Sequence, residues 1–563
     1  MNILGISSLD TDCTACLLVD GKIVSSIAEE RLSRIKMHAG FPSRSIDAIL
    51  KERGMTPKDI DIIAYAFLPW TKEAEKISSC YVKDLAYNMA KSDTLKAKFY
   101  HTAYYTRWTY GAIMAHRKFH HELVENLKKM GLEKKLYRVE HHLTHAAAAY
   151  YSSGFEDALI VTLDAYGSGL AGTISVGTPD GIKRVHNIPY PHSMGLYYSQ
   201  VTEALGFRPI RHEGKIVGLA SFGDQNVLFD KVYRKFDNSN SSYKYISAWD
   251  MKFCRELATH YKREDIAAAY QAVLERVITD MIAPYLKKYN MTNVCLAGGV
   301  AANVKLNQRV FEIDGVKNIF VFPNMGDGGT GAGAALWAYR QNSNHPLQSN
   351  PIENVYYGPE YSDDQIRHAL DKESLEYTYM EDIEKEIAVL LADNKVVARF
   401  NGRMEYGPRS LGNRSILYPA VDPEVNTWLN KRLGRTEFMP FAPATLYEYR
   451  DKCYVHMKGA EHTSKFMTIT FDCTDYMKKT SPAAVHIDGT ARPQLVTEEI
   501  NPSFYRIITE YYKITGIPSI INTSYNMHEE PIVCTPFDAI RAFKLGHLEY
   551  LAMGKFLVRN KEE

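Results

Sequence analysis

This sequence has no surplus of charge and no long apolar run. Lys and Arg number 67 and Asp and Glu 66 among 563 residues, so the formal net charge is +1. A chain this close to neutral has no overall field that would draw it to nucleic acid or anionic lipid. A membrane-spanning helix needs about 20 mostly apolar residues, and no such run occurs. We therefore expect neither nucleic acid nor a membrane as a partner, and phosphate recognition must come from local basic clusters.

Cysteine is sparse, and the phosphate-binding motif of P-loop proteins is absent. Of eight cysteines only Cys13 and Cys16 form a CxxC pair. They fall in an expected strand, where residues three apart face opposite ways, so we interpret them as small buried residues. No GxxxxGK followed by Ser or Thr occurs, which excludes a P-loop. Sparse cysteines, and an N-terminus that shows an acidic residue at Asp10 and no long apolar stretch, predict a cytoplasmic protein without a secretory signal.

One arrangement of strands and turns occurs twice. A strand, a polar turn and a hairpin at the N-terminus return about 155 residues later. The hairpins turn at Asp20-Gly21 and Asp180-Gly181, a strong signal for a tight turn. The strands expected in this repeat are Asn2–Ile6, Thr14–Val19, Lys22–Ala28, Asp157–Leu163 and Thr173–Val176. The period is too long for a solenoid and indicates two duplicated α/β halves.

Further elements divide the chain into two units. Thr71–Leu132 is helical in pattern and rich in aromatic residues, which indicates either packing between helices or an insertion that shapes an acceptor pocket. Gln341–Pro351 is polar and helix-breaking, so we place a boundary there. The units predicted are 1–345 and 355–563. Other expected elements are the helices Ile266–Tyr289 and Gly331–Arg340 and the strands Val294–Ala297, Asn318–Phe322, Val396–Phe400, Lys465–Phe471 and Ser519–Asn522.

The spacing of two histidines indicates a metal site. His141 and His145 lie four apart at the start of an alanine-rich stretch, so a helix would place both imidazoles on one face. Alone, this pair is more often two surface histidines. Asp327, in a turn after an expected strand, could be a third ligand. Two imidazoles and a carboxylate with open positions are typical of a non-haem iron(II) site.

Glycine-rich turns and arginine clusters indicate sites for phosphate. The segments Asp164–Gly169 and Gly298–Asn303 each follow an expected strand, and glycine lets backbone N–H groups approach an anion. Lys215, between two glycines, either reaches a phosphate or is an exposed loop lysine. Three arginines lie in the glycine-rich segment Gly402–Arg414. Arginine forks suit phosphate or carboxylate, and the clustered arginines are Arg403, Arg409, Arg414, Arg432, Arg435 and Arg492.

The chain resembles the O-carbamoyltransferases of antibiotic tailoring and nodulation-factor modification, the NodU/CmcH type. The similarity runs over essentially the whole sequence. The motifs that carry it are DGKIVSSIAEERLSRIK, EHHLTHAAAAYY, HEGKIVGLASFG, CLAGGVAANVKLN, GDGGTGAGAA, EYGPRSLGNRSIL, EFMPFAPA, HIDGTARPQ and NTSYNMHEEPIVCTPFDAI.

The resemblance implies a fold, a reaction and its partners. The N-terminal unit would be a duplicated ASKHA domain of the actin and sugar-kinase type, and the C-terminal unit a YrdC-like α/β domain. The C-terminal unit would form carbamoyl-AMP from carbamoyl phosphate and ATP. The N-terminal unit would pass the carbamoyl group to a hydroxyl of a small molecule, with Fe(II) or a similar divalent metal. A homodimer is the family's expected assembly.

The resemblance also assigns residues. His141, His145 and Asp327 match the metal ligands. The nucleotide-contacting motifs contain Asp164, Gly167, Gly169, Lys215, Gly298, Gly299 and Asn303. The C-terminal adenylate motifs contain Arg409, Arg414, Arg435, Arg492, Asn522 and Ser524.

The chain departs from the family pattern at the residue expected to act as general base in the transfer step. Many members carry a His-Asp pair in the first turn, where Thr11 and Asp12 stand here. Either Asp10 or Asp12 is then the base, or the transfer step relies on the metal and positioning. Alternative functions are carbamoyl transfer to a macromolecule and a non-catalytic ATP-binding scaffold.

Overall fold

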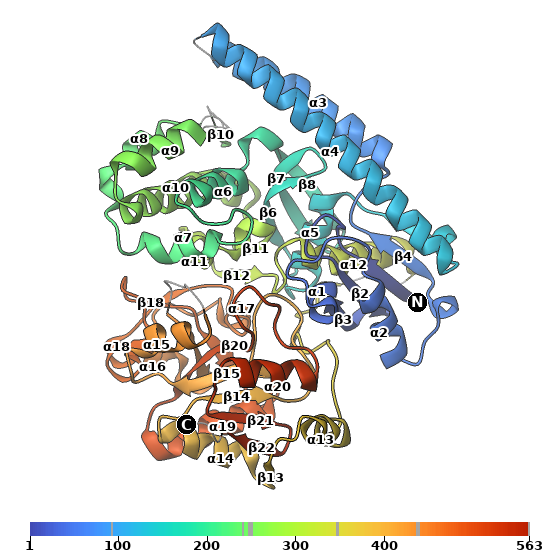
Figure 1. Cartoon of the computed structure of the whole chain (residues 1–563). Helices are drawn as coiled ribbons and strands as arrows, with labels where there is room; N and C mark the ends of the chain where they lie inside the picture. The colour runs from blue at the N-terminus through green and yellow to red at the C-terminus, as the bar shows by residue number, and fades with distance from the viewer. Residues whose placement is uncertain (92–93, 239–240, 246–250, 345–347, 435–439, 561–563) are drawn as a thin grey trace. The chain divides into compact units, whose positions relative to one another are not determined.

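The computed structural model of the chain (Figure 1) describes residues 1–91, 94–238, 241–245, 251–344, 348–434 and 440–560. It contains two compact units. Unit 1 comprises residues 1–25 and 38–352, and unit 2 comprises residues 26–37 and 353–563. The short segment 26–37 was not expected to belong to the second unit. It is held there by hydrogen bonds from Ser26 N to Tyr357 O (3.1 Å) and from Arg34 to the carbonyls of Pro531 and Ile532 (2.8 Å each).

Unit 1 contains two five-stranded sheets with the same topology. The first has the order β3-β2-β1-β4-β5 and the second β8-β7-β6-β11-β12. In each, an antiparallel meander is followed by two strands parallel to its first. The strands are β1 Asn2–Ile6, β2 Thr14–Val19, β3 Lys22–Ala28, β4 Ile62–Tyr65, β5 Leu136–Arg138, β6 Ala158–Gly167, β7 Leu170–Thr178, β8 Gly181–Pro189, β11 Asn293–Ala297 and β12 Asn318–Val321. The predicted duplication of α/β halves is confirmed.

Each sheet is followed by a helix of small residues, and these two helices pack together. They are α5 (His141–Tyr151) after β5 and α12 (Thr330–Asn342) after β12. A Cβ at Gly333 of α12 would lie 1.8 Å from the carbonyl oxygen of Thr144 in α5. Only glycine permits this approach, which brings the start of α5 and the turn before α12 to one place.

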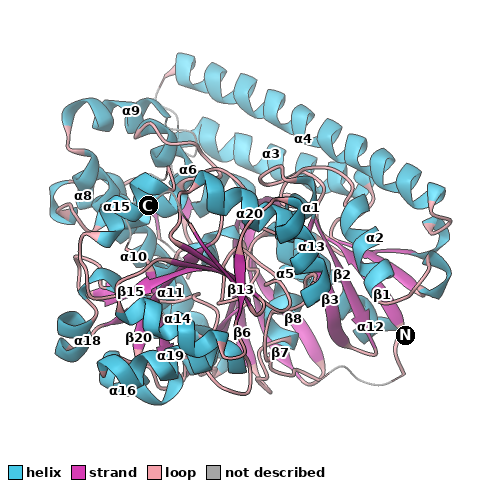
Figure 2. Ribbon diagram, turned by 60° about the horizontal axis from the view of Figure 1, so that its bottom comes forward, coloured by secondary structure: helices cyan, strands magenta, loops and turns pink. Residues whose placement is uncertain are grey.

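The remaining helices of unit 1 lie between successive strands in the chain. Between β4 and β5 the chain forms a long helical pair, α3 and α4, as predicted for Thr71–Leu132 (Figures 1 and 2). Among the described residues, no helix combines the length and apolar character that a bilayer crossing requires. The α-helices of unit 1 outside the central pair are α2 Ser43–Glu52, α3 Trp70–Lys91, α4 Leu95–Lys129, α6 Met194–Ala204, α7 Glu213–Ala220, α8 Phe229–Tyr233, α9 Met251–His260, α10 Arg263–Tyr289 and α11 Val304–Phe311.

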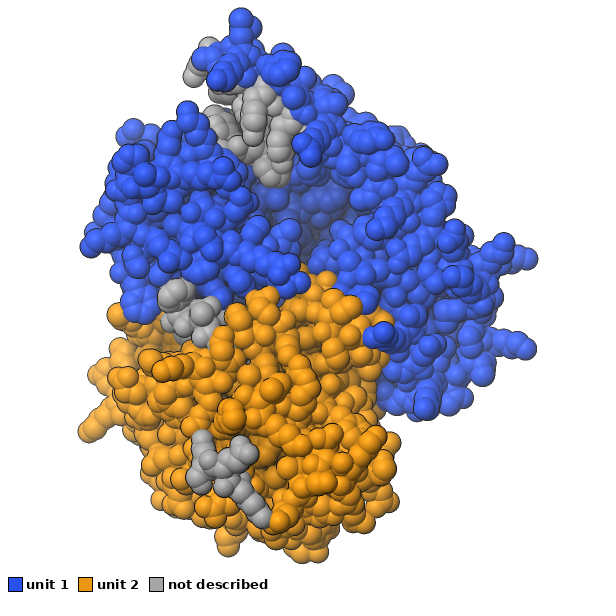
Figure 3. Space-filling model, in the orientation of Figure 1, with its two compact units in different colours: residues 1–25, 38–352 blue, residues 26–37, 353–563 orange. Residues whose placement is uncertain are grey.

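Unit 2, orange in Figure 3, is built on a mixed eight-stranded sheet of the order β13-β22-β21-β14-β15-β20-β16-β19. Helices α14 and α19 pack against it around a core that includes Leu391, Phe504 and Ile520. The sheet strands are β13 Tyr377–Tyr379, β14 Val397–Phe400, β15 Arg414–Pro419, β16 Ala442–Leu446, β19 Gln494–Val496, β20 Ser519–Ser524, β21 Tyr550–Met553 and β22 Phe556–Arg559. The longer helices are α13 Asp363–Lys372, α14 Ile383–Ala392, α15 Val425–Arg432, α19 Pro502–Thr515 and α20 Pro536–Leu545.

Two expected strands need correction. The prediction for Lys465–Phe471 was wrong, because only Phe471–Asp472 (β17) forms a strand there. Apolar residues in this segment are buried without joining the large sheet, and hydropathy alone does not separate the two cases. The strand expected to end at Leu163 continues to Gly167, with an irregular register between those two residues.

The glycine-rich loop before β15 is organised by its own charged side chains. One carboxylate oxygen of Glu405 accepts hydrogen bonds from the backbone N–H groups of Leu411, Asn413 and Arg414 at 2.8–3.1 Å. The guanidinium of Arg414 is fully buried and donates to four carbonyls, at 2.7–3.3 Å. It also lies 3.8 Å from the ring centre of Phe400. These contacts favour a structural role for Arg414.

Arg414→Ala should therefore lower the free energy of unfolding of the full chain by at least about 3 kcal/mol, because several buried carbonyls lose their donors. Chemical denaturation measures this loss. Arg506→Ala is the matched control, since that side chain is half-exposed and pairs with Asp382 at the surface; it should cost less than about 1 kcal/mol. Equal stability of Arg414→Ala and Arg506→Ala would show that the buried contacts do not hold the loop.

Candidate active site

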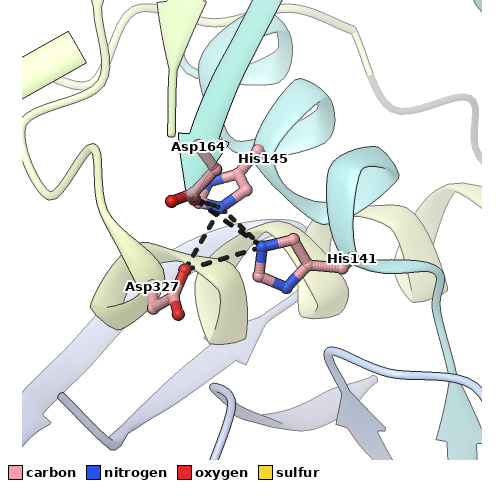
Figure 4. A group of neighbouring side chains, drawn as sticks. All are labelled: His141, His145, Asp164 and Asp327. Atoms are coloured by element: carbon pink, nitrogen blue, oxygen red, sulfur yellow. Dashed lines mark hydrogen bonds and ion pairs between the residues drawn. The ribbon is translucent and has the colours of Figure 1, made fainter. Parts of the chain in front are cut away.

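Four side chains that could hold a metal ion meet in unit 1 (Figure 4). His141 and His145 lie on the first turns of α5, and Asp327 starts the turn before α12. Asp164 lies in the irregular part of β6. The structure thus brings together the three residues predicted from the sequence and adds Asp164, which had been assigned to nucleotide contact. The only sequence feature that pointed to Asp164 was its position between a strand and a glycine turn. That position suits a metal ligand and a nucleotide contact equally.

The ligand atoms of this cluster converge on one point. The Nε2 atoms of His141 and His145 are 3.1 Å apart. Asp164 Oδ2 lies 3.1 Å from His145 Nε2 and 3.7 Å from His141 Nε2, and Asp327 Oδ1 lies 3.5 Å from both. Both histidines are buried, so they are not surface residues.

The electrostatics of the cluster favour a positive charge beside its two carboxylates. Burial alone would lower the pKa of His141, but the carboxylates of Asp164 and Asp327 raise it to about 9. Burial tends to raise the pKa of Asp164, but the two imidazoles hold it well below its usual range. Burial and the charge of Asp164 raise the pKa of Asp327. A divalent cation would satisfy both acids without any proton in the cluster.

The donor set fits such a cation. Asp164 Oδ2 and Asp327 Oδ1 have no hydrogen-bond partner among the described residues, although both are buried. Buried carboxylate oxygens without donors are costly unless a charge compensates them. Two imidazoles and two carboxylates suit Fe(II) or another divalent first-row metal, and would leave coordination positions open.

The glycine turn of β6 shapes this cluster. A Cβ at Gly167 would lie 2.0 Å from His141 Cδ2, so glycine makes room for the imidazole. At the next residue, Ser168 Oγ accepts a hydrogen bond from His141 N (3.4 Å) and donates one to Glu73 Oε1 (3.0 Å). Glu73 also accepts from Leu68 N (2.9 Å) and comes from α3. The helical insertion therefore supports the turn that holds His141, which the sequence did not indicate.

The first turn of the chain lies beside the cluster. Ser8 Oγ is 3.4 Å from Asp327 Oδ2 and also hydrogen-bonds Asp10 Oδ1. Thr14 Oγ1 donates to Gly328 O at 2.6 Å. A Cβ at Gly328 would lie 2.9 Å from Asp12 Oδ2. Both acids proposed as bases are thus near Asp327.

The other predicted nucleotide residues have structural contacts of their own. Gly298 (φ +95°) passes so close to β6 that a Cβ would lie 2.1 Å from Leu163 O, and a Cβ at Gly299 would lie 3.1 Å from Asp164 Oδ1. Asn303 caps α11 and pairs with Gln271. Gly169 (φ +80°) lies against α3. Lys215 is buried on α7, not exposed in a loop, with Nζ 5.9 Å from the ring centre of Phe207.

The predicted adenylate residues of unit 2 differ in how deeply they are buried. Asn522 is buried and donates to Ser410 O (3.2 Å) and Gln494 Oε1 (2.7 Å). Arg409, Arg492 and Ser524 are partly exposed. Arg435 lies outside the described residues.

Comparisons with known proteins agree on one family. The family described as Carbamoyltransferase N-terminus matches residues 2–336, and Carbamoyltransferase C-terminus matches residues 388–560. Nodulation protein NolNO of Sinorhizobium fredii is 31% identical over 98% of this chain and 79% of its own. "Uncharacterized protein sll1178" of Synechocystis is 30% identical over 99% of this chain and 96% of its own.

A solved structure with some likeness is the activator of the 2-hydroxyisocaproyl-CoA dehydratase from Clostridium difficile. It is 14% identical, covers 61% of this chain and 95% of its own, and has a TM-score of 0.33. A likeness this low supports no inference.

Gly167→Ala should weaken metal binding by roughly 10- to 100-fold, because the added methyl group displaces the His141 imidazole. Titration of the metal-free protein with Fe(II) or Co(II) against a competing chelator measures the affinity. Gly111→Ala, at a helical glycine with open space around it, is the control and should bind as the wild type does. Unchanged affinity in Gly167→Ala would contradict the assigned ligand geometry.

Glu73→Gln should change how stability depends on pH. Burial raises the pKa of Glu73 from 4.5 to about 7, outweighing its hydrogen bonds from Leu68 and Ser168. A raised carboxyl pKa means that the folded state keeps a proton which the unfolded state loses, so stability falls as pH rises from about 4.5 to 7. Gln keeps the hydrogen bonds and has no proton to lose. The free energy of unfolding of the variant, relative to that of the wild type, should therefore rise by up to about 3 kcal/mol across this range.

Denaturation of metal-free protein at a series of pH values measures this difference. Glu75→Gln, exposed on the same helix, is the control and should give a much smaller change. If the difference in free energy of unfolding between Glu73→Gln and the wild type did not change with pH, Glu73 would not carry a buried proton.

Proposed function

The chain belongs to the carbamoyltransferase family and is a transferase enzyme, and we propose that it activates a carbamoyl group with ATP before transferring it to a hydroxyl of a small molecule. The observation that carries this proposal is the buried cluster of two imidazoles and two carboxylates. It supplies a site for a Lewis acid in a family whose reaction acts on a carbonyl group.

The first step is assigned to unit 2. Water hydrolyses carbamoyl phosphate to carbamate and phosphate. An oxygen of the carbamate then attacks the α-phosphorus of ATP and expels pyrophosphate. The product is carbamoyl-AMP. The partly exposed Arg409 and Arg492 are the groups proposed to bind the phosphates, since arginine forks match such anions. Arg414 would support them by holding the loop.

The second step is assigned to unit 1. The acceptor hydroxyl attacks the carbamoyl carbon, and AMP leaves with the electrons of the broken bond. His141, His145, Asp164 and Asp327 would hold a divalent metal, which polarises a carbonyl oxygen when bound. The glycine turns at Gly298 and Gly299, next to Asp164, are proposed to lie along the nucleotide.

The near-neutral charge of the chain favours a small acceptor over nucleic acid, because tRNA binding draws on many phosphate contacts with basic residues. A homodimer is proposed from the family alone.

The proposal predicts that the two steps separate by mutation. His141→Ala and Asp164→Asn should each lower metal content and carbamoyl transfer at least about 100-fold, while pyrophosphate release from ATP with carbamoyl phosphate stays within a few-fold of wild type. Pyrophosphate is measured by a coupled assay, and transfer by mass spectrometry of carbamoylated products.

Asp157→Asn is a matched control for Asp164→Asn. Asp157 directly precedes β6, the strand that bears Asp164, and its side chain accepts a hydrogen bond from Asn293 at the surface. It should retain both steps. Absence of carbamoyl phosphate-dependent pyrophosphate release by the wild type would refute the adenylate route, and full transfer by His141→Ala would remove the metal from the reaction.

A further inference from the structure

Helix α4 brings a histidine to the edge of the metal-binding cluster. The ring of Phe67 stacks on that of His141, with centres 4.8 Å apart and planes at 25°, and meets the ring of His116 edge-on, also at 4.8 Å. His116 is therefore separated from a proposed metal ligand by one phenyl ring. The charges of Asp10 and His141 both act on His116, which again places it beside the cluster.

The second contact of His116 is with the strand that bears Asp164. Its Nε2 lies 3.2 Å from the hydroxyl oxygen of Tyr166, two residues after Asp164 in β6. The Tyr166 ring is in turn in edge contact with Trp108 of α4 and with Tyr190, whose two rings stack at 3.8 Å. The imidazole is thus held in orientation from two sides, by Phe67 and by Tyr166.

His116 is half-buried, as are Trp108 and Tyr166. Burial lowers the pKa of His116 to about 4, although the charge of Asp10 favours its protonated form. The ring is therefore neutral near pH 7, with one nitrogen able to accept a proton. A neutral imidazole close to a buried metal site is suited to proton transfer.

We propose that His116 is a catalytic residue, the group that takes the proton from the attacking acceptor hydroxyl. This rests on the proposed function, because it requires a hydroxyl to attack the carbamoyl group near His141. His116 and His141 both contact the ring of Phe67, so the acceptor hydroxyl would lie beside that ring, between the carbamoyl group and His116.

The hydroxyl oxygen forms a bond to the carbamoyl carbon while its O–H bond breaks and the proton passes to the unprotonated nitrogen of His116. The bond from that carbon to the phosphate oxygen breaks, and AMP leaves with the electron pair. A hydroxyl becomes strongly acidic as its oxygen bonds to carbon, so a weakly basic imidazole suffices to accept the proton. Asp10 stabilises the imidazolium that forms.

Tyr166 is a positioning residue in this proposal. Its hydroxyl oxygen fixes the orientation of the His116 ring through Nε2. Trp108 and Tyr190 present aromatic surface next to that pair, so the body of the acceptor would pack against them.

The test compares two acceptor probes on the full-length protein with ATP and carbamoyl phosphate. Glycerol is a hydroxyl acceptor that needs a base. Hydroxylamine attacks through a neutral nitrogen and loses its proton after the bond has formed. Glyceryl carbamate and hydroxyurea are quantified by mass spectrometry and corrected for the reaction without protein.

His116→Ala should lower the rate of glyceryl carbamate formation by about 10²- to 10⁴-fold and leave that of hydroxyurea within a few-fold of wild type. Added imidazole should restore part of the lost rate, which a purely structural defect would not allow. Tyr166→Phe should give a smaller loss of the same kind. His121→Ala, an exposed histidine on the same helix, is the control and should leave both products unchanged.

Three results would overturn the proposal: full glyceryl carbamate formation by His116→Ala, an equal loss of both products, or a wild type that forms hydroxyurea but no glyceryl carbamate. Failure of the wild type to release pyrophosphate would instead refute the proposed function itself, so the two failures can be told apart.

Discussion

Two carboxylates and two imidazoles share a space in unit 1 that is too small for them without a compensating charge. Their facing atoms lie 3.1–3.7 Å apart, and two of the oxygens have no donor among the described residues. Buried carboxylates of this kind need a positive charge beside them, and a bound divalent cation would supply it to both. The strands, helices and turns around the cluster hold these four side chains together.

Three close approaches bring the cluster about. Gly333 lets α12 lie against the backbone of α5, Gly167 makes room for the His141 ring, and Gly298 brings the turn after β11 against β6. Each is a place where a methyl group would collide with another part of the chain. The helical insertion adds Glu73, which reaches His141 through Ser168, and His116, which reaches Tyr166. The insertion is thus part of the site and not only a packing element.

Two arginines of unit 2 show that residue type and spacing alone do not establish a functional role. Arg409 and Arg414 lie in the same glycine-rich segment and looked alike as anion ligands. The structure separates them, because the Arg414 guanidinium is buried on backbone carbonyls while Arg409 is partly exposed. A guanidinium satisfies carbonyls as readily as phosphates, so charge and spacing do not distinguish a loop organiser from a ligand.

The sequence by itself determined the duplicated α/β halves, the helical insertion and the HxxxH pair, because alternation of apolar residues, Asp-Gly turns and helical spacing are local properties. It did not determine the strand status of Lys465–Phe471, whose burial depends on distant packing. Only the tertiary structure decided that Asp164 joins the histidines and that residues 26–37 belong with unit 2. It also decided that Glu73 is linked to His141 through Ser168, and that His116 lies across the Phe67 ring from it. These contacts join residues tens to hundreds of positions apart, and no local pattern records which of them the folded chain brings together.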